Sequence, residues 1–169
     1  MPVNARDLSV AVFARGLTNL KALLTKGEAH AAASGMEASA LLDAQLAPGM
    51  HTLAAQAHWA AEGARLGVDR LIGKATAASA GEARTFAELY DRIDATIAYL
   101  AAVGPEELEA GLDRTITIEH RGGAMRFVGS QFLLEFAIPS FFFHVTTAYG
   151  IVRHQGVPIT KGDFLGPLG

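Results

Sequence analysis

The sequence contains no cysteine, which excludes disulfide bonds, thiolate metal sites and a cysteine nucleophile. It also lacks any block of basic residues, and its 14 Lys and Arg against 17 Asp and Glu give a net charge of −3. This charge balance argues against a nucleic-acid partner. Charged residues and Pro139 interrupt the apolar stretches, none of which reaches the ~18 uninterrupted residues of a membrane span.

The chain is long enough, and apolar enough, to form one folded domain. Half of its 169 residues are apolar, so it can bury a core, and we expect a single domain over residues 1–169. The first residues lack the basic segment and apolar core of a signal peptide. Together with the absence of cysteine, this predicts a cytoplasmic protein with no membrane partner.

Apolar residues recur at helical spacing in four long segments, which predicts an all-α fold of the four-helix-bundle kind. The third segment has the clearest start, because Thr85 and Glu88 fit a capping box. The fourth contains Pro139, which lacks a backbone N–H and should kink or restart the helix. The predicted helices are 7–34, 50–72, from Thr85 to Gly104, and 130–154, with a small helix near Leu41 and Leu42 and a loop over 74–81.

A small β-hairpin is predicted between the third and fourth helices. Residues 115–118 alternate in polarity, and residues 125–128 return after the Gly122-Gly123 pair. Two glycines suit a two-residue turn, which would set the register of the two strands. The expected cross-strand pairs are Ile118 with Phe127 and Glu119 with Arg126, both of which are favourable.

Three consecutive phenylalanines, residues 141–143, cover most of the circumference of the fourth helix. A four-helix monomer rarely buries one helix on all sides, so this segment predicts contact with a second subunit and a homodimer. The tail, residues 159–169, is expected to dock rather than stay free. The sequence leaves open whether the tail packs on its own subunit or crosses to the other.

The last helix resembles that of a known superfamily. Residues 144–158, HVTTAYGIVRHQGVP, resemble the DinB/YfiT-like superfamily, in which a metal-binding His precedes a helical run, an Arg and a Gly-Val-Pro exit. Residues 141–149, FFFHVTTAY, resemble the signature of an uncharacterised bacterial family within it, a domain of unknown function, as do residues 13–17, 46–50 and the tail. The resemblance implies an up-and-down four-helix bundle, commonly a homodimer, and no assigned reaction.

The resemblance also implies where a metal would bind. Superfamily members often hold a divalent ion through three His, one on the second helix and two spaced four residues apart on the fourth. Some act as thiol-dependent transferases or hydrolases. Here His144 matches the later His of the fourth helix, Ser140 stands at the earlier position, and His58 lies nearest the expected place on the second helix.

The residues themselves allow one metal site. His58 and Glu62 are spaced i, i+4 on one helical face, and with His144 they would offer two imidazoles and a carboxylate to a Zn, Ni, Fe or Mn ion. A water on such an ion would suit a metal-dependent hydrolase or thiol transferase. In the alternative interpretation, Glu62 is solvated and both His are hydrogen-bonded structural residues.

A metal-free pocket is a third interpretation. Gln56, His144, Thr146, Thr147 and Tyr149 could line a cavity that binds a small molecule. Thr147 follows His144 by three residues, although a helical Thr often bonds back to the preceding turn. The sequence assigns no reaction. An uncharacterised bundle protein, a metal-dependent enzyme and a dimer that binds a small ligand remain as alternatives.

Overall fold

The computed structural model describes residues 3–77, 81, 83–120 and 122–167, and within them the chain is mostly helical with one small antiparallel sheet. The predicted helical class and hairpin are therefore confirmed, while short helices accompany the four long ones. The elements are α1 Ala5–Leu8, α2 Val10–Ser34, α3 Ala38–Leu42, α4 Leu53–Ile72, α5 Phe86–Ala101, α6 Pro105–Gly111, β1 Thr115–His120, β2 Gly123–Val128, α7 Gly129–Gln131, the π-helix η1 Phe132–Ala137, α8 Ile138–His154 and α9 Lys161–Leu165.

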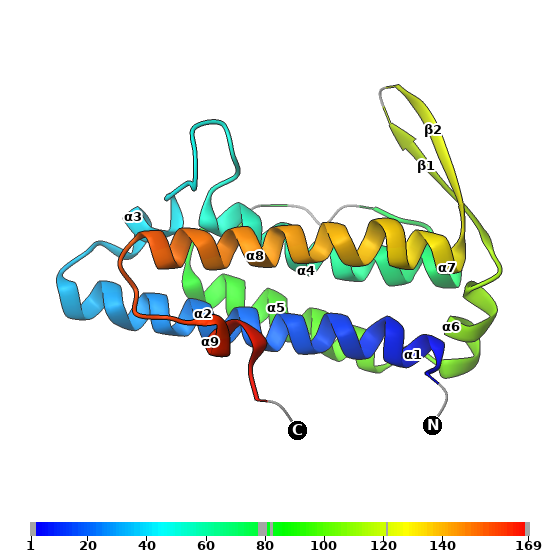
Figure 1. Ribbon diagram of the computed structural model, residues 1–169, viewed down its shortest axis with the longest axis horizontal. Coiled ribbons are helices and arrows are strands. Elements are labelled where there is room, and N and C mark those ends of the chain that lie inside the picture. The colour runs from blue at the N-terminus through cyan, green and yellow to red at the C-terminus, as the bar shows by residue number, and fades with distance from the viewer. Residues whose placement is uncertain (1–2, 78–80, 82, 121, 168–169) are drawn as a thin grey trace.

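Four long helical segments lie side by side, namely α2, α4, α5 and the run from η1 through α8 (Figure 1). α4 packs against α5 and α8, and α2 packs against the same two helices. α2 and α4 therefore lie across the core from each other. The hairpin projects from one end of this assembly, where α6 and α7 also lie (Figure 1).

The neighbouring helices α4 and α5 run in the same direction. His58 lies beside Arg92 near the start of both helices, and Asp69 lies beside Tyr99 near their ends. α2 and α8 are parallel as well, while α2–α5 and α4–α8 are antiparallel. The expected up-and-down arrangement is therefore wrong, and the order is up-down-down-up.

The segment between α4 and α5, residues 73–85, makes this order possible. α4 has 20 residues and is about 30 Å long. An extended segment of this length spans about 40 Å, so it can return along the whole of α4 before α5 begins. We call it the crossover; residues 78–80 of the predicted loop lie outside the described residues. The sequence marks it as a loop but does not show that it reverses the direction of the next helix.

The helix ends follow local signals. Gly35 and Gly73 stop α2 and α4 in left-handed conformations, with φ of 75° and 76°. The capping box of Thr85 and Glu88 is confirmed, with both hydrogen bonds at 3.2 Å. α4 begins at Leu53 rather than at residue 50, and α2 at Val10 rather than at residue 7, because a separate short helix, α1, precedes it.

The fourth long segment contains a π-helix directly before Pro139. η1 widens the turn ahead of the residue that lacks a backbone N–H, and α8 then continues to His154. Among the described residues, the segment Gly129–His154 is long and apolar enough to cross a membrane by length and composition alone. That is weak evidence, since a core helix passes the same test, and the cytoplasmic location stays a prediction.

The hairpin register differs from the expected one. His120 pairs with Gly123, so the turn lies one residue earlier than predicted, and Arg121 within it is outside the described residues. Ile118 faces Met125 and not Phe127. Moving the turn by one residue shifts the pairing by two, which leaves every side chain on the same face. The alternation in the sequence therefore cannot distinguish the two registers.

The tail packs on its own chain. α9 lies against α2, where the Asn19 amide donates to the carbonyl of Leu165 at 2.9 Å. Lys26 pairs with Asp163, and the ring of Phe164 meets that of Tyr149 at 5.8 Å between centroids. The described part of the tail therefore packs against α2 of the same chain, and whether the tail crosses to a second subunit stays a prediction.

Gly129 lies where two backbones approach closely. A β-carbon there would lie 1.9 Å from the carbonyl oxygen of Gly111 and 3.0 Å from that of Leu112. Gly129→Ala should therefore lower the free energy of unfolding by about 2–3 kcal/mol, because one backbone segment must move. Urea denaturation measures this.

Gly63→Ala provides the control, since nothing lies within 4 Å of a β-carbon at Gly63 in the interior of α4. It should raise the free energy of unfolding by about 0.5–1 kcal/mol through helix propensity. Equal destabilisation by both substitutions would contradict the close approach at Gly129.

Candidate functional site

Helix α4 carries buried polar side chains that point in two directions. His58, Glu62 and Asp69 are buried on the side of α5, where they contact Arg92, Arg65 or Tyr99. Gln56 is buried on the side of α8 and contacts His144. Two separate polar sites therefore flank α4.

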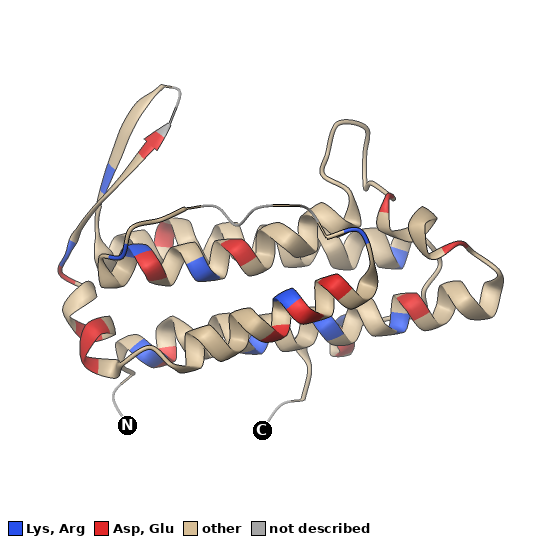
Figure 2. Cartoon of the chain, turned by 180° about the vertical axis from the view of Figure 1, so that it is seen from behind, with Lys and Arg blue, Asp and Glu red and all other residues tan. Residues whose placement is uncertain are grey.

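The first site is an ionic network on α4. Arg65 binds Glu62 at 2.6 Å and Asp69 at 2.8 Å, and both carboxylates are almost completely buried. The Tyr99 hydroxyl donates to Asp69, and Lys74 donates to that hydroxyl at 3.1 Å. Charged residues of both signs accordingly lie along α4 and α5 where these helices are seen from behind (Figure 2).

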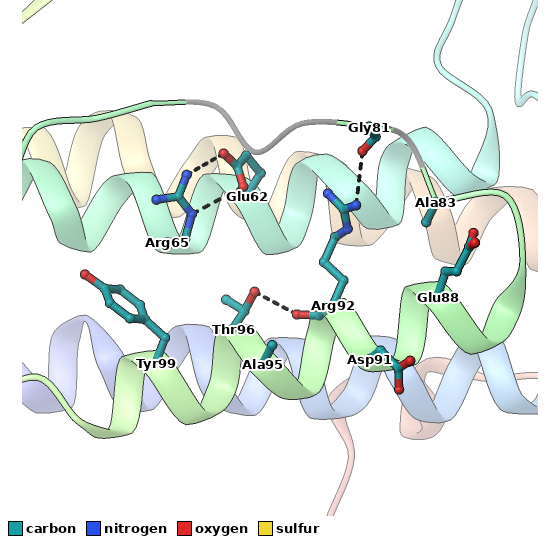
Figure 3. A pocket seen from close by; sticks show the side chains of 10 residues that line it. All are labelled: Glu62, Arg65, Gly81, Ala83, Glu88, Asp91, Arg92, Ala95, Thr96 and Tyr99. Carbon is teal, nitrogen blue, oxygen red and sulfur yellow. Dashed lines mark hydrogen bonds and ion pairs between the residues drawn. The ribbon is translucent and has the colours of Figure 1, made fainter.

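Two arginines of this first site hold the crossover. Arg65 donates to the carbonyl of Ala77 at 2.6 Å, and Arg92 donates to that of Gly81 at 3.0 Å. Arg92 also lies 2.6 Å from Nδ1 of His58. A cleft of about 600 Å³ lies between α4 and α5. Figure 3 shows Arg92 reaching from α5 to Gly81 of the crossover, and Arg65 paired with Glu62. Protein groups already bind both arginines. The first site therefore accounts for the path of the crossover rather than for a bound ligand.

The second site centres on His144 of α8. Its Nδ1 lies 2.8 Å from Oε1 of Gln56, and the amide nitrogen of Gln56 donates to the carbonyl of His51 at 3.4 Å. This arrangement places the amide oxygen toward the imidazole, so Nδ1 carries the proton and Nε2 keeps its lone pair. Burial lowers the pKa of His144, and the nearby His51 lowers it further, so the ring is neutral at pH 7.

His144 lines a small hollow on the outer side of α4 and α8. We call it the α4–α8 groove; its volume is about 110 Å³, and its lining includes Trp59, Gly63, Arg70, Phe136, Ser140 and His144. Nothing lies within 4 Å of a β-carbon at Gly63, so the middle of the groove is open. An apolar wall with a few polar groups is typical of small-molecule sites.

The expected metal ligands do not come together. His58 is bound by Arg92 and Glu62 by Arg65, on the side of α4 that faces α5. His144 instead contacts Gln56 on the other side. Within the described part of the chain, no group of three His, Cys, Asp or Glu side chains could hold an ion. The interpretation with His58, Glu62 and His144 as a metal centre is therefore wrong, and the donor set does not fit the superfamily's metal.

The expected polar pocket forms only in part. Of the predicted pocket residues, Gln56 contacts His144, and His144 alone lines the α4–α8 groove. Thr147 donates to the carbonyl of Phe143 in its own helix at 2.7 Å, as a helical Thr often does, and Thr146 is exposed. Tyr149 packs against the tail. These last three residues do not line the groove that contains His144.

Sequence reasoning missed the α4 side of the groove. Trp59, Gly63 and Arg70 follow one another at intervals of three or four residues with Leu66, a spacing that places them on one helical stripe. This stripe could have indicated a groove on α4. Apolar and small residues at this spacing are, however, also typical of a helix face that packs in the core. His51 is not among the predicted site residues, yet it lies near enough to His144 to lower the pKa of that ring.

Comparison with known proteins places the chain in a family. The family model of DUF1993, a domain of unknown function, matches residues 6–165. The chain belongs to this family. Its structure is similar to the crystal structure of a DinB family member protein from Shewanella denitrificans, with 36% identity, a TM-score of 0.87 and coverage of 96% of this chain and 92% of that chain. No curated protein matches the sequence.

These findings confirm a DinB-like fold and a family whose description assigns no reaction. The expected membership in a domain-of-unknown-function family within that fold is likewise confirmed. The description of the family supplies no substrate.

The pH dependence of stability reports on His144. Because its pKa in the folded chain lies below the unfolded value of about 6.5, the unfolded chain binds more protons between the two values. The free energy of unfolding therefore falls as the pH drops through this window. Above the window, the stabilisation that comes from keeping the His144 ring neutral is fully present. We expect the loss in urea midpoint from about pH 7.5 to about pH 5 to be smaller in His144→Asn than in the wild type.

The control for this comparison is His154→Asn, which removes an exposed imidazole at the end of the same helix. It should keep the wild-type loss in midpoint. An identical loss in the wild type and in His144→Asn would contradict the burial of a neutral imidazole beside Gln56.

Proposed function

We propose that this DUF1993 protein binds a small molecule in the α4–α8 groove, with Nε2 of His144 as its hydrogen-bonding contact. The observation that carries the proposal is the bond between buried Gln56 and Nδ1 of His144. A side chain that holds one ring nitrogen of a His orients the ring and fixes its tautomer. Among the residues that the structure describes, no metal ligand set accompanies the oriented ring, so a bound molecule is the partner that suits Nε2.

The groove suits a molecule with an apolar body. Trp59 and Phe136 supply aromatic surface, and a volume of about 110 Å³ approaches that of cavities that take up benzene. The neutral Nε2 accepts a hydrogen bond, so the preferred ligand carries an O–H or N–H at the end near His144. The site therefore favours a compact apolar molecule with one donor.

Phenol and toluene test this selectivity, because they differ by one hydroxyl. Trp59 is the chain's one tryptophan and lines the groove, so its indole N–H signal in NMR reports binding at this place. In the wild type, phenol should give a saturable shift and bind about fivefold more tightly than toluene, the value of one hydrogen bond. His144→Leu should remove this preference.

Gly63→Met should abolish binding of both probes, since its side chain fills the open middle of the groove. Ala98→Met, on an exposed position of α5, is the matched control and should bind as the wild type does. Unsaturable shifts in the wild type, or undiminished binding to Gly63→Met, would refute the proposed site.

We also propose that the protein acts as a homodimer, with the outer side of α8 as the contact. Phe143 is 56% exposed, and its ring lies 5.5 Å from that of His144. Leu134 on the same long segment is 53% exposed. Large apolar side chains exposed to solvent are typical of subunit contacts. A second copy would cover Phe143 beside the groove.

Phe143→Ser should convert a dimer into a monomer at micromolar concentration, measured by light scattering after size exclusion. The reason is the loss of a large apolar contact at the centre of the proposed interface. Leu165→Ser, which removes an exposed apolar side chain from the tail on the α2 side, should stay dimeric. A wild-type monomer at this concentration would refute the dimer.

A further inference from the structure

Arg70 occupies the end of the α4–α8 groove opposite His144. It lies in the last turn of α4, whereas Gln56, which binds His144, lies in the first turns of the same helix. Arg70 lines the groove together with Phe136 and Ser140. A molecule in the groove would therefore have an imidazole at one end and a guanidinium at the other.

Arg70 is the cation of α4 that the described residues leave without a partner. It makes no hydrogen bond or ion pair of 4 Å or less with any residue that the structure describes. Arg65 one turn earlier binds two carboxylates, and Arg114 donates to the carbonyl of Leu71 at 3.2 Å. Only Arg70 of these three keeps its full set of donors available.

Arg70 is a partly desolvated charge without a protein partner among the described residues. Arg70 is half-buried, and the loss of hydration lowers its pKa although it remains a cation. No buried side-chain donor lacks a partner among the described residues, so the guanidinium donors of Arg70 remain accessible to solvent. A carboxylate in the groove can accept two hydrogen bonds from one guanidinium.

The surroundings of Arg70 favour an anion as well. On the side away from the groove, Arg70 borders a hollow with Lys74 and Arg114. The nearest acidic neighbour, Asp69, is already bound by Arg65 and by Tyr99. The electrostatic potential at this end of the groove is therefore positive.

We propose that the ligand of the groove is a small monocarboxylate, held by Arg70 at its charged end and packed against the aromatic wall along its body. This inference rests on the proposed function of the groove. The volume of about 110 Å³ limits the body to about one six-membered ring or a short aliphatic chain. A hydroxyl at the far end would meet Nε2 of His144, so a hydroxy acid fills both polar ends.

4-Hydroxybenzoate and 4-hydroxybenzamide test the proposal, because they share a shape and a hydroxyl and differ in charge. With the Trp59 indole signal as the readout, the wild type should bind the benzoate at least about tenfold more tightly, as expected for a charge-assisted pair. Arg70→Gln should bind the two probes equally, and Arg70→Lys should keep part of the preference. The wild-type comparison stands even if a variant fails to fold.

Arg84→Gln is the matched control, since it removes the same charge from an exposed position outside the groove. It should keep the wild-type preference. If Arg84→Gln and Arg70→Gln lose the preference for the benzoate equally, the assignment of a carboxylate to Arg70 is overturned. Displacement of the benzoate by inorganic phosphate at equal concentration would overturn it as well.

The probes also separate this inference from the function on which it rests. If phenol binds in the groove but the benzoate binds no better than the benzamide, the carboxylate proposal fails and the small-molecule site stands. If neither phenol nor either acid derivative gives a saturable shift at Trp59, both proposals fail together.

Discussion

The burial of Glu62 and Asp69 on α4 is the constraint on which the rest of the structure depends. A buried carboxylate without a partner costs several kcal/mol, so this side of α4 must meet cations and donors. Arg65 binds both carboxylates, and Tyr99 of α5 donates to Asp69. Arg65 also reaches the crossover at Ala77, so one network joins α4, α5 and the segment between them. The parallel direction of α4 and α5 is the arrangement in which all these groups are satisfied.

Once that side of α4 faces α5, its opposite side is left for α8. Small residues there, Gly63 and Gly67, leave room between the helices, and Gly67 brings Ala137 within ordinary contact distance. The groove thus forms because α4 and α8 pack together where α4 carries little side-chain volume. Its two polar ends differ in kind: His144 is neutral and oriented by a neighbour, whereas Arg70 is charged and has no described partner.

The similarity to a DinB family member concerns the fold, and the polar residues of this chain have their own arrangement. Ser140 stands where the superfamily's pattern has an earlier His, and His58 is held by Arg92 on the other side of α4. What stays at the shared position is His144, now supported by the amide of Gln56. Where the structure describes the chain, no set of ion ligands surrounds this ring, and its fixed orientation suits the proposed recognition of a small molecule.

The sequence by itself determined the features that depend on a few neighbouring residues. The capping box of Thr85 and Glu88, the stop at Gly35 and the existence of a hairpin each arise within about four residues of chain, where steric and hydrogen-bonding preferences act directly. Only the tertiary structure decided the direction of α5, the hairpin register and the partners of His58 and His144. The partners of His58 and His144 depend on contacts between segments more than thirty residues apart, in which packing and the pairing of buried charges select one arrangement. The hairpin register is local, but two registers place the same side chains on each face, so the pattern of the sequence allows both equally.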